Sequence, residues 1–530
     1  MQETGKIPVV EEGAPYDASV EAASGQEDVE VTEIKGTAAD RQAMWRMGKV
    51  QEMRRNFRFV SIFGFSMILM ASWETMLGTA TIGLIDGGTA GLIWMYLICW
   101  IGFICVNTSM AEMGSMAPTS GGQYHWVSEF APPQSQKFLS YMIGWLCVLG
   151  WQTGAANTAF LAGSQIQGLI ALNKPDYSFE PWHGTLLVFA VSAFNVVFNT
   201  FLVKKLPLIE AIILVVHVFG FFAVLVVLWV TGPIGDAHAT FTTFNDYGGW
   251  NNLGLATLSG LVAVILPLLG ADAAVHMSEE LRDASKTLPR SMLWTTMING
   301  SMGFIMLITF CSVLGSLDDA LASPTKQAYL YVFYNSTQSL AGASVMGALV
   351  ISMAIFCNLS ITATSSRQLF AFARDQGVPF SKTFAYVAPK WDVPINAICL
   401  SFAVSCLLSL INLGSSVALM NIASLSTAAI LASYIVSISC IALKRIRGEP
   451  LLPSKFKLGR AGLPINIASI IFLVFVFIFS FMPMGPKPTP AGMNWSILMF
   501  GSTVVFSLIY YYFKGRHVYA GPVAYVRKSL

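Results

Sequence analysis

The chain has 530 residues, of which 55% are hydrophobic and only 11% are charged, and its formal net charge is +2. A soluble globular protein carries about 25% charged residues, so 31 basic and 29 acidic side chains are too few to cover a soluble protein of this length. The composition excludes a soluble enzyme, a disordered scaffold and a nucleic-acid binder with a basic surface. It leaves a multi-pass protein embedded in a lipid bilayer.

The first 58 residues precede any apolar segment long enough to span a membrane. Residues 11–33 hold eight acidic side chains and no lysine or arginine, a composition that cannot bury a core and predicts disorder. Residues 41–58 hold six basic side chains, which is typical of a cytoplasmic flank or an interfacial helix. We therefore expect residues 1–58 to form a disordered acidic tail and a basic juxtamembrane segment.

Twelve segments then have the roughly 20 mostly apolar residues that a membrane-spanning helix needs. They are residues 59–85, 91–116, 138–170, 184–203, 207–231, 253–278, 291–315, 342–373, 395–412, 417–443, 464–483 and 494–513. Glycine, proline and aspartate mark the joins between many of them. The sequence predicts an all-α membrane domain over residues 59–513, followed by a tail over residues 514–530.

The distribution of lysine and arginine predicts the orientation of these spans. If the amino terminus lies inside and the loops alternate, the inner segments hold 26 of the 31 basic residues and the outer loops hold 3. Cytoplasmic loops carry an excess of basic residues, so both termini are expected to be cytoplasmic. The sequon Asn335-Ser336-Thr337 then falls in an outer loop, which makes Asn335 a candidate glycosylation site.

Two of the twelve spans contain helix-breaking or charged residues in their middle. In the first span, Glu74 lies within residues 71–75, and a carboxylate at that depth costs several kcal/mol unless it faces a cavity or a partner. In the sixth span, Pro267 and Gly270 precede Asp272, and proline and glycine together can interrupt a helix.

Interrupted helices five spans apart are the arrangement expected of two five-helix repeats of opposite topology, here about 59–231 and 253–443. Substrate and coupling-ion sites lie at such breaks. Glu74 is therefore a candidate site residue, with a structural ion pair or a polar helix contact as the alternative. Asp272 has an equally good alternative role, because it could cap the second half of the sixth helix.

Four segments, in the same order along the chain, resemble one known family. They are Ser72-Trp73-Glu74, Ala111–Trp126, Gly270-Ala271-Asp272 with His276–Glu280 and Pro289, and Ser366–Asp375 with Pro379. The sequence is similar to the amino acid–polyamine–organocation permeases, and most of all to the fungal branch of amino acid, GABA and choline permeases. The resemblance covers about residues 59–515 and is specific for the branch rather than for a substrate.

The resemblance implies a five-plus-five inverted-repeat core with two extra helices over about residues 464–513. It also implies alternating access coupled, in fungi, to the proton gradient. The expected function is import of an amino acid or a related amine such as GABA or choline, together with H+, across the plasma membrane. A nutrient receptor for the same ligands, or a transporter of polyamines or other organic cations, is the alternative. An enzyme would need a catalytic or metal cluster, and a channel would need a continuous pore.

The family's substrate positions carry over to both breaks. They are Ser72, Trp73 and Glu74 in the first span, and Leu268, Leu269, Gly270 and Ala271 in the sixth. Glu74 would pair with a substrate ammonium or carry the coupling proton, for which Asp272 is the second candidate. The first break has no glycine, unlike the glycine-rich break that binds a carboxylate through backbone N–H groups in other branches. This difference argues against α-carboxylate recognition.

Other polar and aromatic side chains have two interpretations each. Trp73 could offer a π face to a cation, worth about 0.5–2 kcal/mol, or could pack between helices. The polar groups of the third span from Trp151 to Asn157, and Asn358 in the eighth span with Thr362 and Thr364, could line the cavity. Interhelical hydrogen bonds are the favoured interpretation for both sets.

Charged residues near the inner face are candidates for a cytoplasmic gate of ion pairs. The expected members are Glu112, Arg282 and Arg367, with Glu279, Glu280, Arg374 and Asp375 nearby. The alternative is topogenic charge and surface pairs worth under about 1 kcal/mol each. His125 and His217 could carry protons, although packing is more common for a lone histidine. The eight cysteines all lie in apolar runs without a CxxC or Cys/His cluster, so neither a disulfide, a metal nor a cofactor is expected.

Overall fold

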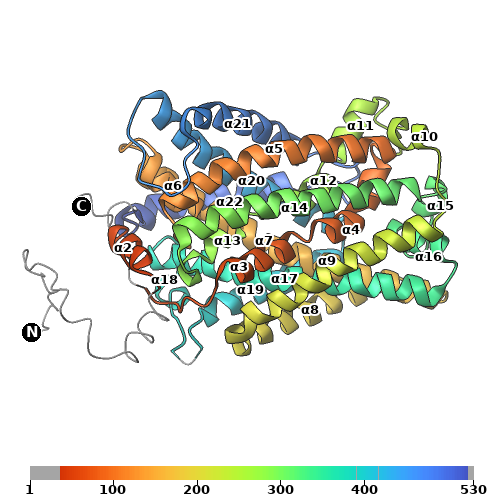
Figure 1. Cartoon of the computed structure of the whole chain (residues 1–530), viewed down its shortest axis with the longest axis horizontal. Coiled ribbons are helices and arrows are strands. Elements are labelled where there is room, and N and C mark those ends of the chain that lie inside the picture. Colours follow the sequence, from red (N-terminus) through yellow and green to blue (C-terminus); the bar gives the residue numbers. More distant parts are fainter. Residues whose placement is uncertain (1–35, 50, 390, 416, 523–530) are drawn as a thin grey trace, which may run out of the picture.

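The computed structural model describes residues 36–49, 51–389, 391–415 and 417–522. The acidic stretch at residues 11–33 lies outside these described residues. The described part of the chain is helical, without a β-strand, and its long helices run side by side along the long axis of the molecule (Figure 1).

Every predicted span corresponds to a helical segment of the structure. These segments are α3 (Phe59–Met70) with α4 (Ser72–Ile85), α5 (Gly88–Met116), α7 (Gln136–Asn173), α8 (Pro181–Phe201), α9 (Leu206–Thr231), the interrupted set from α11 (Leu253–Ser259) to α13 (Ala273–His276), α14 (Ala284–Ser312), α17 (Leu340–Arg374), α19 (Ile395–Ser409), α20 (Ala418–Ile446), α21 (Gly462–Phe479) and α22 (Ser496–Tyr510). Among the described residues, ten spans, the first one included, are long and apolar enough to cross a membrane. The remaining two are the polar-rich α7 and the interrupted sixth span. The predicted fold class is thus confirmed.

The two ends of the bundle differ in the short helices that they carry. One end carries α2 (Ala38–Arg46), α6 (Gln123–Phe130), α13 and α18 (Ser381–Phe384), at the left of Figure 1, and we call it the basic end. The opposite end, which we call the far end, carries α10 (Ala237–Thr242), α15 (Leu317–Leu321) and α16 (Ala328–Thr337). The first and last described segments both lie at the basic end, as an even number of spans requires.

The first break consists of a single residue. Ala71 adopts a left-handed conformation, with φ 38° and ψ 52°, and it ends α3 and precedes α4. A side chain bearing a Cβ pays roughly 1–2 kcal/mol for this conformation, so the surrounding contacts must hold it. The interruption predicted for residues 71–75 is therefore present but narrower, because α4 already begins at Ser72.

The second break is wider and is built from the proline and glycine in the sequence. The segment passes from α12 (Val262–Ile265) through the 3₁₀ turn η3 (Leu266–Leu268) to residues without helical structure, where Gly270 has φ +104°. The Ser72 hydroxyl donates to the Pro267 carbonyl and joins the two breaks. α3 packs against α13 and α4 packs against α12. The interrupted helices therefore run antiparallel and meet at their breaks.

The segment before the first span folds onto the helical bundle. Asp40 in α2 accepts from the backbone N–H groups of Asp283 and Ala284, at 2.9 and 3.0 Å, and so caps α14. Met47 and Phe57 are buried in the core. The juxtamembrane segment is therefore held by protein contacts at the basic end, which the interfacial-helix interpretation did not include.

Asn335 does not lie in an irregular loop. It belongs to α16, whose apolar residues Leu330 and Phe333 are buried, and Ser336 of the sequon is buried with them. The connection between α14 and α17 folds because this apolar face packs on the bundle. Glycosylation of Asn335 remains a prediction, now at a half-buried helical position.

Candidate functional site

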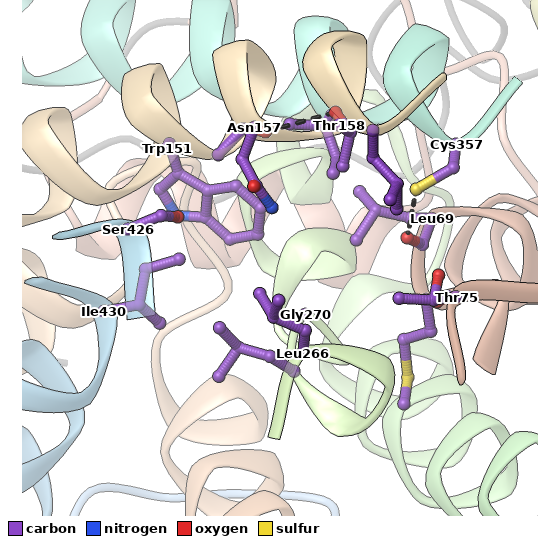
Figure 2. Close-up of a pocket in the computed structure, with 15 residues that line it drawn as sticks. Leu69, Thr75, Trp151, Asn157, Thr158, Leu266, Gly270, Cys357, Ser426 and Ile430 are labelled. Atoms are coloured by element: carbon purple, nitrogen blue, oxygen red, sulfur yellow. Dashed lines mark hydrogen bonds between the residues drawn. The ribbon is translucent and has the colours of Figure 1, made fainter. Parts of the chain in front are cut away.

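A narrow cavity of about 60 Å³ lies where the two breaks meet. Its walls come from α3, α4, α7, α17, α20 and the sixth-span break, and Figure 2 shows their side chains converging on one space. The residues that line it are Leu69, Met70, Thr75, Trp151, Gly154, Asn157, Thr158, Leu161, Leu266, Leu269, Gly270, Cys357, Ile361, Ser426 and Ile430. The lining is apolar except for a few amide, hydroxyl and indole groups, and it contains no basic side chain.

A smaller adjoining space of about 10 Å³ connects this cavity to the acid of the first break. It shares Thr75, Thr158, Leu161 and Cys357 with the main cavity and adds Glu74, Gln165 and Ala354. Glu74 is only 2% exposed, and its Oε2 has no hydrogen-bond partner among the described residues. A carboxylate with one unpartnered oxygen therefore lies at a space that adjoins the cavity.

The other oxygen of Glu74 begins a chain of hydrogen bonds across three helices. Glu74 Oε1 lies 2.7 Å from His217 Nδ1 in α9, and His217 Nε2 lies 3.0 Å from Asn299 Oδ1 in α14. Asn299 Nδ2 donates to the Met67 carbonyl in α3 at 2.8 Å. The chain connects the first break to two helices that support it.

This geometry locates one proton between Glu74 and His217. The Met67 carbonyl can only accept, so the Asn299 amide must present its NH₂ group to Met67 and its oxygen to His217. His217 Nε2 therefore carries a hydrogen, and the remaining proton lies on either Glu74 Oε1 or His217 Nδ1. In either form the pair is neutral overall, which a buried site favours.

The structure divides the substrate positions implied by the resemblance into two groups. Leu269 and Gly270 line the cavity, and Glu74 lines the adjoining space. Ser72, Trp73, Leu268 and Ala271 are buried but are not part of either lining. Trp73 packs against the rings of His217 and Phe221, with centroids 6.2 Å apart in both cases.

Asn358 is occupied by contacts between helices. Its Nδ2 donates to the Ala155 carbonyl at 2.6 Å and to Thr158 Oγ1 at 2.7 Å, and its Oδ1 accepts from Asn195 at 2.5 Å. The side chain thus joins α17 to α7 and α8 and does not line the cavity. Five residues of the third span do line it, and among them are Trp151 and Asn157.

Asp272 forms a separate polar cluster on the basic-end side of the cavity. It accepts from Gln123 Nε2 at 2.6 Å and from the Tyr434 hydroxyl, and His276 Nε2 lies 4.0 Å away. Its side chain is fully buried and accepts no capping hydrogen bond from the backbone N–H groups of α13. Asp272 therefore connects the sixth-span break to α6 and α20, and its part in proton coupling remains a prediction.

Ion pairs close the basic end between the end of the sixth span and α17. Arg374 makes two hydrogen bonds to Glu279, at 2.7 and 2.9 Å, and Arg367 Nε donates to Glu280 at 2.9 Å. Lys49, from the segment before the first span, pairs with Asp375. These pairs tie three distant parts of the sequence together.

The Glu279 carboxylate is stabilised in its charged form. Burial opposes its ionisation, but Arg374, Lys49 and the Ser120 N–H outweigh burial and lower the pKa of Glu279 from 4.5 to about 2. Burial also lowers the pKa of Lys49, against the opposing effect of Asp375. The Glu279–Arg374 pair is therefore charged throughout the pH range in which cells live.

Two of the three expected gate residues have other partners. Glu112 accepts from Arg445 Nη2 at 2.6 Å and from the Leu458 N–H at 2.9 Å, so it fastens the segment between α20 and α21. Arg282 donates through Nε to the Arg55 carbonyl at 3.1 Å. Of the three, only Arg367 takes part in the ion pairs between the end of the sixth span and α17.

Several site residues were absent from the sequence-based set for a physical reason. Trp151 is one of several polar or aromatic groups of the third span, and the sequence does not show which face of that helix meets the breaks. Lys49 is one of six basic residues in the segment 41–58, and the sequence does not distinguish it from the other five. His217 had a weak signal, a lone histidine in an apolar span, but its partner Glu74 is 143 positions away in the sequence.

Comparison with known proteins agrees with this architecture. Residues 57–503 match the family described as amino acid permease. The chain is 31% identical to a protein of Macrophomina phaseolina named as an amino acid/polyamine transporter, over 80% of this chain and 94% of that protein. It is 28% identical to an uncharacterized amino-acid permease of Schizosaccharomyces pombe, over 95% and 92% of the two chains. It is also 29% identical to a choline transporter of Saccharomyces cerevisiae, over 88% and 82%.

These matches confirm the family that the four sequence segments indicated. They agree with the helical fold, in which the first and sixth spans are interrupted at a common cavity. The chain therefore belongs to the amino acid permease family of the amino acid–polyamine–organocation superfamily, and it is a multi-pass membrane transporter.

Proposed function

We propose that this permease imports a small amine or quaternary ammonium compound, such as GABA, choline or an amino acid, together with protons. The observation that carries the proposal is the free, buried Oε2 of Glu74 beside the cavity at the two breaks. A carboxylate in this position would attract a positively charged group. The names of relatives, a choline transporter and an amino acid/polyamine transporter, support a cationic amine as the shared feature of the substrates.

The rest of the lining suits the apolar part of such a substrate. Trp151 presents an indole ring to the cavity, and a ring face attracts an ammonium or trimethylammonium group. No lysine or arginine lines the cavity to take up a carboxylate. A polyamine carries several positive charges and would need more than the single acid that Glu74 supplies, so a singly charged ammonium group fits better.

Proton coupling would use the Glu74–His217 pair. A substrate cation next to Glu74 favours the ionised carboxylate, and the proton then resides on His217. Substrate and proton would thus occupy adjacent positions of one site. The cavity of about 60 Å³ holds only a few water molecules, so substrate entry requires the walls to separate, as alternating access provides.

In this conformation the ion pairs at the basic end form the closed gate. We place the basic end in the cytoplasm, because the segments assigned there hold 26 of the 31 basic residues. Both termini are then cytoplasmic, and the membrane is the plasma membrane. The adjoining space at Glu74 and Gln165 extends toward the far end, so substrate would enter from outside the cell.

Uptake of radiolabelled GABA, choline, amino acids and polyamines into a permease-deficient strain tests the proposal. We expect accumulation of a substrate that bears a single ammonium group, abolished by a protonophore. Glu74→Gln should abolish accumulation while the protein still reaches the membrane, because the amide attracts no cation and carries no transferable proton. Glu180→Gln, at an exposed acid, should transport normally.

Two results would contradict the proposal. Accumulation that is indifferent to the protonophore would remove proton coupling. Normal accumulation by Glu74→Gln would remove Glu74 from the site. Binding of a ligand without its uptake would support the receptor interpretation instead.

A further inference from the structure

A second acid lies buried in α9, outside the site described above. Glu210 has no exposed surface. Its Oε1 accepts from the Ser360 hydroxyl of α17 at 2.8 Å, while its Oε2 has no hydrogen-bond partner among the described residues. The described part of the chain contains no ion pair to Glu210 either. An isolated carboxylate at membrane depth is costly, so Glu210 carries its proton in this conformation.

The helices around Glu210 supply no positive charge to replace that proton. α3, whose Gly64 lies against the Glu210 carbonyl, contains no titratable residue. The titratable or polar neighbours from α17 are the Cys357 thiol and the Ser360 hydroxyl. Lys204 and Lys205 in the 3₁₀ turn η2 (Val203–Lys205), which packs against α9, are exposed, as are Lys286 and Arg290 on α14. None of these four forms an ion pair with Glu210 among the described residues, and the tyrosines of α16 lie toward the far end.

Glu210 lies between the Glu74–His217 pair and the basic end. It is seven residues before His217 on the same helix, which is two turns or about 10 Å along the axis. α9 begins at Leu206, so Glu210 lies about one turn from the helix end at the basic end. Cys357, one turn from Ser360 on α17, lines the same small space as Glu74. The Glu74–His217 pair and Glu210 thus lie one after the other along α9, where this helix packs against α3 and α17.

We propose that Glu210 is the proton acceptor through which the Glu74–His217 pair releases its proton toward the cytoplasm. Glu210 first loses its own proton to the cytoplasmic side and becomes a carboxylate. The proton shared by Glu74 and His217 then moves to Glu210, which restores the neutral acid and leaves Glu74 ionised. No other reactant is needed. This inference rests on the proposed proton coupling and adds its exit step.

A structural role for Glu210 makes a different prediction. If the residue only accepted the Ser360 hydrogen bond, glutamine would replace it, because its amide oxygen accepts equally well and its volume is similar. If Glu210 carries protons, glutamine fails and aspartate, which can still titrate, retains part of the function. The pair of variants therefore separates the two roles.

The test compares net uptake with exchange in proteoliposomes loaded with the substrate identified by the uptake panel. For Glu210→Gln we expect proton-driven accumulation to fall by about a hundredfold, the usual contribution of a positioned proton-transferring group. Exchange of external for internal substrate, which needs no proton release, should persist. A pH-sensitive dye inside the vesicles should report less substrate-driven acidification. Glu210→Asp should retain accumulation, and Glu449→Gln, at an exposed acid, should match the parent.

Normal accumulation by Glu210→Gln would overturn the inference, and so would loss of exchange together with accumulation, since that pattern indicates a structural residue. If Glu210→Gln does not reach the membrane, a Glu210→Asp variant that accumulates no substrate but exchanges it normally would also overturn it. The parent protein with a protonophore is a separate arm. If uptake by the parent protein is insensitive to the protonophore, the proposed proton coupling itself is contradicted, irrespective of the results with the Glu210 variants.

Discussion

At the residue scale, the pairing of Glu74 with His217 explains how an acid can remain buried beside the cavity. The neighbouring imidazole lets the pair hold a proton without net charge, and Asn299 fixes which imidazole nitrogen faces Glu74. One Glu74 oxygen is committed to this pair and the other is free. In the proposed mechanism, one oxygen of this carboxylate shares the proton and the other attracts the substrate cation.

Trp151 is the residue whose role in substrate choice is most directly testable. We expect Trp151→Leu to weaken transport of a quaternary ammonium substrate by about 2- to 30-fold, the equivalent of 0.5–2 kcal/mol of lost cation–π attraction. Trp151→Phe should lose less, because it keeps a ring face. Apparent affinity for each substrate, measured as the concentration at half-maximal uptake, provides the readout.

The matched control for this prediction lies on the same helix. Trp145 faces α22, with its ring 5.5 Å from that of Phe506, and does not line the cavity. Trp145→Leu should leave the apparent affinity unchanged. Equal losses in Trp145→Leu and Trp151→Leu would show that helix packing, rather than a ring facing the substrate, explains the effect.

The contrast between Trp73 and Trp151 shows what the sequence could and could not predict about single residues. Both tryptophans lie mid-span, and only the resemblance favoured Trp73. Their roles depend on the rotation of each helix about its axis, which packing against other helices decides. An acid such as Glu74 is different. A carboxylate at membrane depth is unfavourable whichever way its side chain points, so the sequence alone identifies it as a candidate site residue.

At the element scale, the ion pairs of the proposed gate at the basic end are formed by buried charges rather than by surface charges. Glu279 is fully buried and Arg374 nearly so, with side-chain exposures of 0% and 14%. Breaking a buried pair leaves one charge uncompensated and costs about 3–5 kcal/mol, whereas an exposed pair is worth about 0–1 kcal/mol. The position of this pair therefore matters more to the gate than the number of charges nearby.

We expect Glu279→Gln and Arg374→Gln each to reduce substrate accumulation by about tenfold or more, because the basic end no longer closes and accumulated substrate leaks out. The charge swap Glu279→Arg with Arg374→Glu should restore part of the loss. Efflux from preloaded cells measures the leak. Glu449→Gln disrupts an exposed pair with Arg447 and should have no effect. Unchanged efflux in both single variants would contradict the gate.

The same pair sets an expectation for pH. A carboxyl whose pKa falls from 4.5 to about 2 stabilises the closed arrangement fully above pH 4.5, and this stabilisation is lost only as the pH falls toward 2. Proton dependence of transport between pH 4.5 and 7 should therefore be unchanged in shape in the charge-swap variant. A shifted pH profile would mean that the gate itself titrates.

The two breaks show how far sequence patterns reach at this scale. Pro267 and Gly270 predict an interruption by their backbone chemistry, and the structure has one there. The first break has neither residue. Glu74 and the resemblance predict it. The left-handed conformation of Ala71 does not follow from the conformational preference of alanine, because contacts from other helices hold it.

At the scale of the whole molecule, composition and charge were enough to predict the twelve spans and their order. The antiparallel meeting of the first and sixth spans follows from their separation by five helices. What sequence could not supply is the set of long-range partners. Lys49 with Asp375, Glu112 with Arg445 and Glu74 with His217 all connect segments more than a hundred positions apart.

The orientation of the whole bundle leads to the last prediction. Lys487 precedes α22 on the predicted outer side, and Lys382 lies in α18 at the basic end, and both are exposed. A cysteine in place of Lys487 should react with a membrane-impermeant maleimide in intact cells. A cysteine in place of Lys382 should react only after permeabilisation, because the proposed orientation puts the basic end in the cytoplasm. The parent protein, with its eight native cysteines, provides the background. The reverse pattern would invert the topology and make export the natural direction, whereas labelling of neither position before permeabilisation would place the permease in an internal membrane.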